Sequence, residues 1–441
     1  MVVQVVAGRD QAIPPLGDRF FDSGVQFARR DRLAHRSPFL RSVDVDAVEC
    51  RERMDAMDSQ RRMRHEFEDL MQDRPLTDEE FRLLDALQVW PRAPWSVLGG
   101  VLGADPVTVS RRWERISARG LAWITAQPPA LRESHGGLIE VDCAPGATEA
   151  FLEQVSDDPE CLSLDVTSGA RNLLLTVGCA SAGAFSRYLA ERIGARPGVR
   201  AVRANPVVRV IAGGDQWRLH ALDKTESDQV AAAREQDLAR RRAACRGRGE
   251  VDPEVARVLA RDGRVTAQPI ADDLGVPVRV ARRALAATLA SGRLALRLDM
   301  PRWATGWPVS AWYFAQVPSA RLSEVGDRLR ALRAVRAVFS VAGPANVMIN
   351  LWLRELGEVE QFEAVIEQRL PMLHVIDRSL VLSVRKRMGR VFDSGERLSR
   401  TVPWQRTLRE DAGPQAATYA VSDDHRRTGD RGLRNPGPPV R

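Results

Sequence analysis

The chain of 441 residues contains the same helical string twice, and this repeat limits the folds that it can adopt. The string PVTVSRR at residues 106–112 is matched without a gap by PVRVARR at residues 277–283, which lie 171 positions later. Self-similarity at a fixed spacing indicates two copies of one structural unit. We therefore expect a tandem duplication.

Each copy of the string lies in a segment with the signals of three short helices. In the first segment, Thr77 and Glu80 form a capping box at the start of a helix. A second helix follows, and the third begins with Asp105 as its N-cap and Pro106 at its first position. The second segment opens at Asp252 on the same plan. Three short helices with a glycine turn before the third are typical of a helix-turn-helix.

The third helix of each segment has an outer face that is rich in arginine. In the first copy Val109, Trp113 and Ile116 form the buried stripe. Arginine and threonine on the opposite face can read base edges in the major groove of DNA. The residues predicted to contact DNA are Val107, Thr108, Arg111, Arg112 and Arg115 in the first copy and Val278, Arg279, Arg282 and Arg283 in the second. The alternative is a three-helix interaction module with a solvated arginine face.

A segment of strands and helices follows each three-helix segment. Its order in both copies is strand, helix, strand, strand, helix, strand, which is the ferredoxin-like split βαβ arrangement. The hairpin between the second and third strands carries the string GARN at residues 169–172 and GPAN at residues 343–346, which lie 174 positions apart. The predicted fold class is α+β, with two winged or three-helix helix-turn-helix domains, each followed by a ferredoxin-like βαββαβ domain.

These features divide the chain into seven regions. We expect an N-terminal extension of low order, a first helix-turn-helix, a first ferredoxin-like domain, a charged linker, a second helix-turn-helix, a second ferredoxin-like domain and a disordered tail. Their predicted bounds are 1–74, 75–125, 136–222, 223–249, 250–298, 305–392 and 393–441.

Composition limits the cellular setting. No stretch approaches 18 apolar residues, so we expect no membrane span, and the N-terminus lacks the pattern of a signal peptide. The five cysteines are scattered without metal-ligand spacing, which favours a reducing cytoplasm. The net charge of +7 favours polyanionic partners only weakly.

The sequence contains no motif of a known catalytic class. It lacks G-x-S-x-G, the P-loop, H-E-x-x-H and G-x-G-x-x-G, and its six histidines show no ligand spacing. Trp303, Trp307 and Trp312 are spaced to form an aromatic wall, although packing in the core is the better interpretation. We therefore expect a protein that is not an enzyme, with no catalytic residues, no metal site and no cofactor.

The ordered pair of segments resembles the Lrp/AsnC family of prokaryotic transcriptional regulators. The resemblance rests on DPVTVSRRWERI at residues 105–116, on DGR at 262–264 and on IA-x-x-LGV at 270–276, and it covers residues 76–222 and 251–392. In this family the βαββαβ domain responds to amino acids and drives dimerisation. The hairpin residues that the resemblance implies as effector contacts are Gly169, Ala170, Arg171, Asn172, Gly343, Pro344, Ala345 and Asn346.

The resemblance implies a cytoplasmic regulator that binds double-stranded DNA in a sequence-specific way. An amino acid or another small molecule at the βαββαβ domains would gate it. Because one chain carries both copies, we expect an intramolecular pseudo-dimer or a homo-oligomer. The alternative is a small-molecule-binding or protein-interaction module with a degenerate helix-turn-helix.

Overall fold

The computed structural model describes residues 75–127, 135–244 and 251–403. The expected N-terminal extension, the end of the expected linker and most of the expected tail lie outside these residues. No helix within the described ranges is both long enough and apolar enough to cross a membrane.

The first helical segment forms around one apolar stripe. Its helices are α2 (Asp78–Val89), α3 (Trp95–Leu102) and α4 (Pro106–Ala118). The capping box of α2 is present, and the Asp105 carboxylate accepts hydrogen bonds from the backbone at the start of α4. Val109, Trp113 and Ile116 of α4 are buried against the other two helices, as their helical spacing requires.

The second helical segment has the same order with a different cap. Its helices are α9 (Pro253–Arg261), α10 (Ala267–Leu274) and α11 (Val278–Ala290). Asp252 caps α9, whereas α11 begins after Pro277 without a side-chain cap. The expected linker contains helix α8 (Lys224–Ala244), which packs on the first segment through the buried Val230. Strand β1 (Trp123–Gln127) pairs antiparallel with β6 (Ala295–Asp299).

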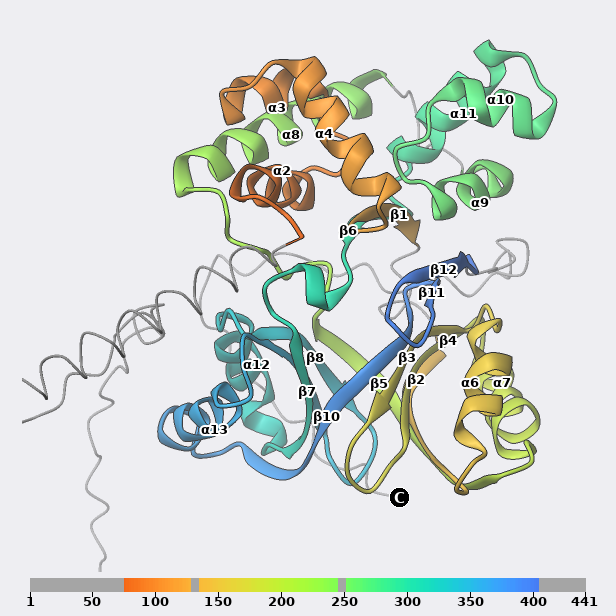
Figure 1. The fold of residues 1–441 in the computed structure, drawn as a ribbon, viewed down its shortest axis with the longest axis vertical. Helices are drawn as coiled ribbons and strands as arrows, with labels where there is room; N and C mark the ends of the chain where they lie inside the picture. Colours follow the sequence, from red (N-terminus) through yellow and green to blue (C-terminus); the bar gives the residue numbers. More distant parts are fainter. Residues whose placement is uncertain (1–74, 128–134, 245–250, 404–441) are drawn as a thin grey trace, which may run out of the picture. The chain divides into compact units, whose positions relative to one another are not determined.

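Two βαββαβ segments follow the helical ones (Figure 1). The first comprises β2 (His135–Cys143), α6 (Thr148–Ser156), β3 (Cys161–Thr167), β4 (Leu173–Cys179), α7 (Ala182–Arg187) with η2 (Tyr188–Gly194), and β5 (Val199–Ala212). The second comprises β7 (Val309–Gln316), η4 (Ser319–Arg321) with α12 (Leu322–Arg330), β8 (Val335–Val341), β9 (Val347–Leu353), α13 (Glu358–Arg369) and β10 (His374–Arg387). The short η3 (Arg302–Ala304) precedes β7.

Helices cover the outer face of each set of strands. Alternate residues of β9, such as Val347 and Ile349, pack under α12 and α13, whereas Met348 between them joins a core on the inner face. In the same way, α6 and α7 cover the outer face of β2, β3 and β4. The inner-face core contains residues of both βαββαβ segments, so the two segments bury their inner faces together.

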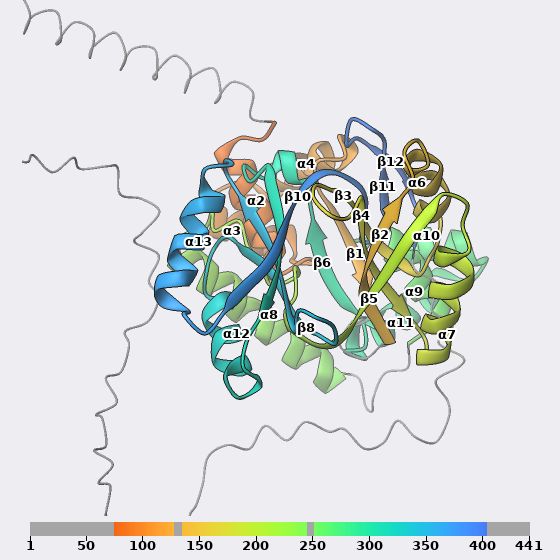
Figure 2. The ribbon, with the colours of Figure 1, turned by 90° about the horizontal axis from the view of Figure 1, so that it is seen from below.

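Two long strands join the segments into one closed sheet (Figure 2). The first part of β5 pairs with β2 and its last part pairs with β8. The first part of β10 pairs with β7 and its last part pairs with β3. The order β10-β3-β4-β2-β5-β8-β9-β7 therefore returns to β10, and none of these eight strands is left as a free edge.

The contacts between the helical segments are reciprocal. The guanidinium of Arg92 donates to the carbonyl oxygens of Gly263 and Val265, at 2.6 and 3.1 Å. In return, Arg264 donates to the carbonyls of residues 91 and 93, at 2.7 and 3.0 Å. Arg92 and Arg264 are 172 positions apart, as are Thr125 and Arg297, which face each other in the β1–β6 pair. The two segments thus contact each other through residues at matched positions.

The expected α+β fold with a ferredoxin-like segment is confirmed at this level.

One expectation is wrong in part. The region 393–441 was expected to be disordered, but β12 (Leu398–Thr401) lies within it and pairs with β11 (Arg390–Phe392). Glu396 holds the turn between these strands by accepting hydrogen bonds from Arg302 and from the Val384 backbone. The sequence pattern missed this pair because its side chains are mostly polar.

Candidate functional site

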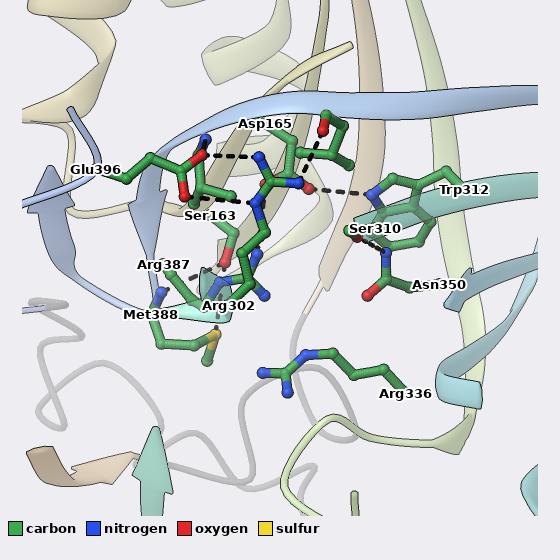
Figure 3. Close-up of polar contacts among 12 residues, drawn as sticks. Ser163, Asp165, Arg302, Ser310, Trp312, Arg336, Asn350, Arg387, Met388 and Glu396 are labelled. Carbon is green, nitrogen blue, oxygen red and sulfur yellow. Dashed lines mark hydrogen bonds and ion pairs between the residues drawn. The ribbon is translucent and has the colours of Figure 1, made fainter. Parts of the chain in front are cut away.

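A cavity of about 220 Å³ opens between the two βαββαβ segments and the β1–β6 pair. Strands β1, β3, β4, β5, β6, β7, β8, β9 and β10 supply its walls, and residues that directly follow β5 and β10 complete them. Three arginines line it: Arg297, Arg336 and Arg387. We call it the arginine cavity, and Figure 3 shows part of its lining, including Asp165, Arg336 and Arg387.

Arg387 has weaker partners than a buried guanidinium normally has, namely an ion pair with Asp165 and the Trp352 ring, whose centroid lies 5.3 Å away. Its residue is 7% exposed, and its side chain donates no hydrogen bond to any described residue. Its nearest carboxylate is that of Asp165, at 3.7 Å, which is beyond hydrogen-bonding distance. Burial lowers the pKa of Arg387. Buried donors in folded proteins are nearly always paired. The N–H groups of Arg387 have no acceptor among the described residues, so they are available to a ligand.

Arg336 is held more firmly, but it too has spare donors. One of its terminal nitrogens lies 3.3 Å from Asp299, and its guanidinium stacks over the Trp352 ring at 3.8 Å. Burial and the charge of Arg387 lower its pKa to about 9. The same carboxylate of Asp299 lies 2.5 Å from Arg297, so the two arginines share one acid. Burial opposes ionisation of Asp299, but the arginine charges prevail and lower its pKa.

Asp165 is the buried acid on the other wall. It is 4% exposed, and its Oδ2 accepts a hydrogen bond of 3.0 Å from the Trp312 indole. Its Oδ1 has no hydrogen-bond partner among the described residues. Burial raises the pKa of Asp165 more than Arg387 and the indole hydrogen bond lower it. This carboxyl group therefore holds a proton more readily than an exposed aspartate does.

Apolar and amide groups complete the cavity. Phe339 stacks on Trp312 with ring centroids 6.0 Å apart. The Asn350 carboxamide donates to Ser310 and to the Ala311 carbonyl, at 3.2 and 3.3 Å. Met388 has a positive φ of 46°, a conformation that is unfavourable outside glycine and that recurs at functional sites. An apolar body with several acidic groups would match such a surface.

The residues predicted to bind DNA lie on α4 and α11. Arg111, Arg279, Arg282 and Arg283 are exposed and form no ion pair with any described residue. Two other predicted contacts are engaged within the chain. Arg112 pairs with Glu79, and Arg115 lies 3.1 Å from Glu80, both on α2. Val107, Thr108 and Arg279 are exposed near the starts of these helices, where Val278 is half-buried.

The predicted effector hairpins are engaged in internal contacts. The Asn172 carboxamide accepts a hydrogen bond from the Cys143 backbone, and the Asn346 carboxamide exchanges two with Val317 at 2.9 and 2.7 Å. Both amides thus join the hairpin to the end of a strand 29 positions earlier. Gly169 has a φ of +91°, and Ala345 is buried. Ala170, Gly343 and Pro344 lie in the same turns.

Sequence reasoning missed most of the arginine cavity. Trp312 was noted in the sequence but was assigned to the core, and it lies on the cavity wall. Arg336 and Arg387 belong to no recognised motif, and arginine is frequent in this chain. A usable signal was the position of charged residues within apolar strand patterns, since an unpaired charge in a sheet core is costly.

A family model of the Lrp/AsnC ligand binding domain matches residues 137–216. The chain therefore contains an Lrp/AsnC ligand-binding domain, and this part of the resemblance is confirmed. The match covers the first βαββαβ segment without its first two residues, together with the start of the loop after β5. No curated protein matches the sequence.

Several solved structures align with parts of the chain. The crystal structure of the siroheme decarboxylase NirDL aligns with a TM-score of 0.45 and 15% identity, over 73% of this chain and 94% of that one. The structure of E. coli AsnC aligns with a TM-score of 0.28 and 20% identity, over 30% of this chain and 93% of that one. The structure of B. subtilis LrpC aligns with a TM-score of 0.26 and 17% identity, over 30% of this chain and 94% of that one.

The match to NirDL corrects one expectation. We expected that a chain with this organisation is not an enzyme, but NirDL, a solved protein that aligns with 73% of the chain, is one. The expectation was wrong because it rested on known catalytic motifs, and these represent only a few chemistries. Among the described residues, no group of three or more His, Cys, Asp or Glu side chains is placed to hold a metal ion.

Proposed function

We propose that the chain is an enzyme that binds a carboxylate-bearing tetrapyrrole in the arginine cavity and decarboxylates it. The observation that carries the proposal is the buried guanidinium of Arg387, which lines the cavity without a hydrogen-bond partner among the described residues. A guanidinium presents a planar set of donors that fits a carboxylate with two parallel hydrogen bonds. The tetrapyrrole class comes from the name of NirDL, and the chemistry of the cavity supports the binding of such a ligand.

The cavity offers different surfaces to different parts of such a substrate. Arg336 and Arg387 would anchor carboxylates that do not react. Trp312, Phe339 and Met388 would contact the flat apolar ring. A reacting carboxylate placed against this apolar side would lose its water, which favours its conversion to neutral CO₂. These residues therefore bind, orient and desolvate the substrate.

The test is a reaction of the purified full chain with siroheme under anaerobic conditions. We expect a change in the absorption spectrum on binding and the loss of CO₂ from the substrate by mass spectrometry. Arg387→Gln should weaken binding at least about tenfold, which corresponds to roughly 1.4 kcal/mol. The matched control is Arg257→Gln on α9, which removes a partly exposed arginine outside the cavity. A wild-type chain that neither binds nor alters siroheme would refute the proposal.

A second candidate function is sequence-specific DNA binding, gated by a small molecule. The observation that favours it is the set of exposed arginines on α11, Arg279, Arg282 and Arg283, which form no ion pair with any described residue. Binding to the gene's own upstream DNA and to random DNA should be compared across a salt series. Arg282→Ala should cost about 1–3 kcal/mol on the specific site if Arg282 reads a base. Equal losses on both DNAs would reduce its role to a phosphate contact.

We also propose that the chain arose by tandem duplication and acts as an intramolecular pseudo-dimer. The reciprocal contacts of Arg92 and Arg264 support this, as does the exchange of partners by β5 and β10. A site at the centre of such a pseudo-dimer would be built by both halves.

A further inference from the structure

The walls of the arginine cavity contain matched positions from the two βαββαβ segments. In the sheet, Asp165 faces Leu174 across β3 and β4, and Phe339 faces Met348 across β8 and β9. Phe339 lies 174 positions after Asp165, and Met348 lies 174 positions after Leu174. The β8–β9 pair is therefore equivalent to the β3–β4 pair. At this spacing, four equivalent pairs line the cavity. They are Leu162 with Arg336, Ser163 with Ala337, Asp165 with Phe339, and Thr176 with Asn350.

Every one of these pairs joins two different chemistries. The β3 side has the acid Asp165, where the β8 side has Phe339. The β8 side has the positively charged Arg336, at the position where the β3 side has Leu162. A cavity built by two identical chains would carry both groups on both sides. Here one wall can release a proton and the other can hold an anion, so an acidic substrate meets two unlike walls.

We propose that Asp165 is the proton donor of the reaction and that the arginine cavity takes its substrate in one orientation. This inference rests on the proposed function and names the catalytic group of the same site. Asp165 is buried, lines the cavity, and is fixed by the Trp312 indole on one oxygen. Its other oxygen has no hydrogen-bond partner among the described residues.

The reaction balances with this one donor. The bond between the carboxylate carbon and the adjacent CH₂ group breaks, and CO₂ leaves. The electron pair of that bond stays on the CH₂ carbon, which takes the proton of Asp165 and becomes a methyl group. Asp165 is left as a carboxylate beside Arg387, whose positive charge stabilises it. A proton from water then restores the acid, so that no oxidant or reductant is needed.

The raised pKa of Asp165 agrees with this role and sets the pH dependence. The donor must be protonated, so turnover should fall as the pH rises through its pKa. Arg387, Arg302 and Glu396 also influence this group, the two arginines favouring its charged form and the glutamate opposing it. Trp312 donates to the carboxylate and lowers the pKa of Asp165. Removing that indole should therefore shift the alkaline limb of the pH profile to higher pH.

The experiment measures siroheme binding, turnover and the pH profile for the wild type and three variants of the full chain. Asp165→Asn should keep the binding affinity within about threefold and lose at least about a hundredfold in turnover. Trp312→Phe keeps the acid. Its turnover should therefore still fall at alkaline pH, but at a higher pH than in the wild type. The control, Asp327→Asn on α12, removes an exposed acid outside the cavity and should match the wild type.

The outcomes separate the two claims. If the wild type releases CO₂ and Asp165→Asn does so at a similar rate with the same alkaline limb, Asp165 is not the donor. If Asp165→Asn does not fold, an unshifted limb in Trp312→Phe refutes the inference independently. If the wild type binds siroheme but releases no CO₂, the proposed reaction fails and Asp165 has no step to catalyse.

Discussion

At the scale of single residues, the strands contain charges buried far from water. Lys386 of β10 has no exposed surface, and its ammonium donates to the Asp158 carbonyl at 2.8 Å. That carbonyl also accepts the Cys161 backbone N–H, so it would keep a donor without the lysine. Because a lone buried charge costs more than it returns, Lys386→Met should stabilise the chain by about 1 kcal/mol at neutral pH. Denaturant unfolding measures this difference.

The pH dependence of the same variant gives a second check. Burial lowers the pKa of Lys386 below its ordinary value of 10.5. Between the two values the unfolded chain binds more protons than the folded chain, so stability of the wild type rises with pH there. The advantage of Lys386→Met should therefore shrink as the pH rises toward 10.5. Lys224→Met, at the exposed start of α8, should show neither effect.

Arg171 was predicted to contact an effector, and its internal ion pairs lead to a different expectation. Its guanidinium lies 2.6 Å from Glu140 and 2.5 Å from Asp377, and stacks over Phe314 at 4.0 Å. Arg171→Met would leave the buried Glu140 without its arginine and should cost about 3 kcal/mol in unfolding free energy. Adding Glu140→Gln should recover part of that loss. An unchanged stability would instead support the prediction that Arg171 contacts a ligand.

The residue scale also shows what the sequence could and could not predict. The caps at Thr77 and Asp105 were predictable because they depend on neighbours three residues away. The cavity was not, because Asp165, Trp312 and Arg387 meet only when three distant strands come together. Local spacing carries no information about such contacts.

At the scale of elements, two adjacent glycines of α3 should respond in opposite ways to the same change. A Cβ atom on Gly99 would lie 2.6 Å from the Ala104 carbonyl oxygen, whereas one on Gly100 would meet nothing within 4 Å. Gly99→Ala should therefore destabilise the chain by about 1–3 kcal/mol through overpacking. Gly100→Ala should stabilise it by up to about 1 kcal/mol, because alanine favours the helix. Thermal unfolding of both variants tests whether the turn before α4 packs this closely.

The crossing strands mark the limit of prediction at this scale. The sequence predicted strands at the positions of β5 and β10, because both are rich in valine and isoleucine. It did not predict that each strand has two successive partners. That exchange depends on strand length, since each has 14 residues, whereas the strands that they join have seven to nine. Length was visible in the sequence, but the choice of partners is a property of the assembled sheet.

At the scale of the whole molecule, closure of the sheet determines how the chain should behave in solution. An exposed strand edge is the usual place for a second copy to add its own strand. The eight strands from β10 through β3 and β8 to β7 use both edges within one chain. We therefore expect the full chain to be a monomer of 48.9 kDa at micromolar concentration. Light scattering coupled to size exclusion measures this mass directly.

Closure of the sheet also predicts that the two βαββαβ segments unfold cooperatively. Because β5 and β10 each bond to both βαββαβ segments, neither segment can leave the sheet without breaking bonds of the other. The two segments should therefore unfold in one transition whose midpoint does not change with protein concentration. Tryptophan fluorescence and far-UV circular dichroism, recorded over a tenfold dilution, should give coincident curves. A midpoint that rises with concentration would show that a second chain completes the sheet.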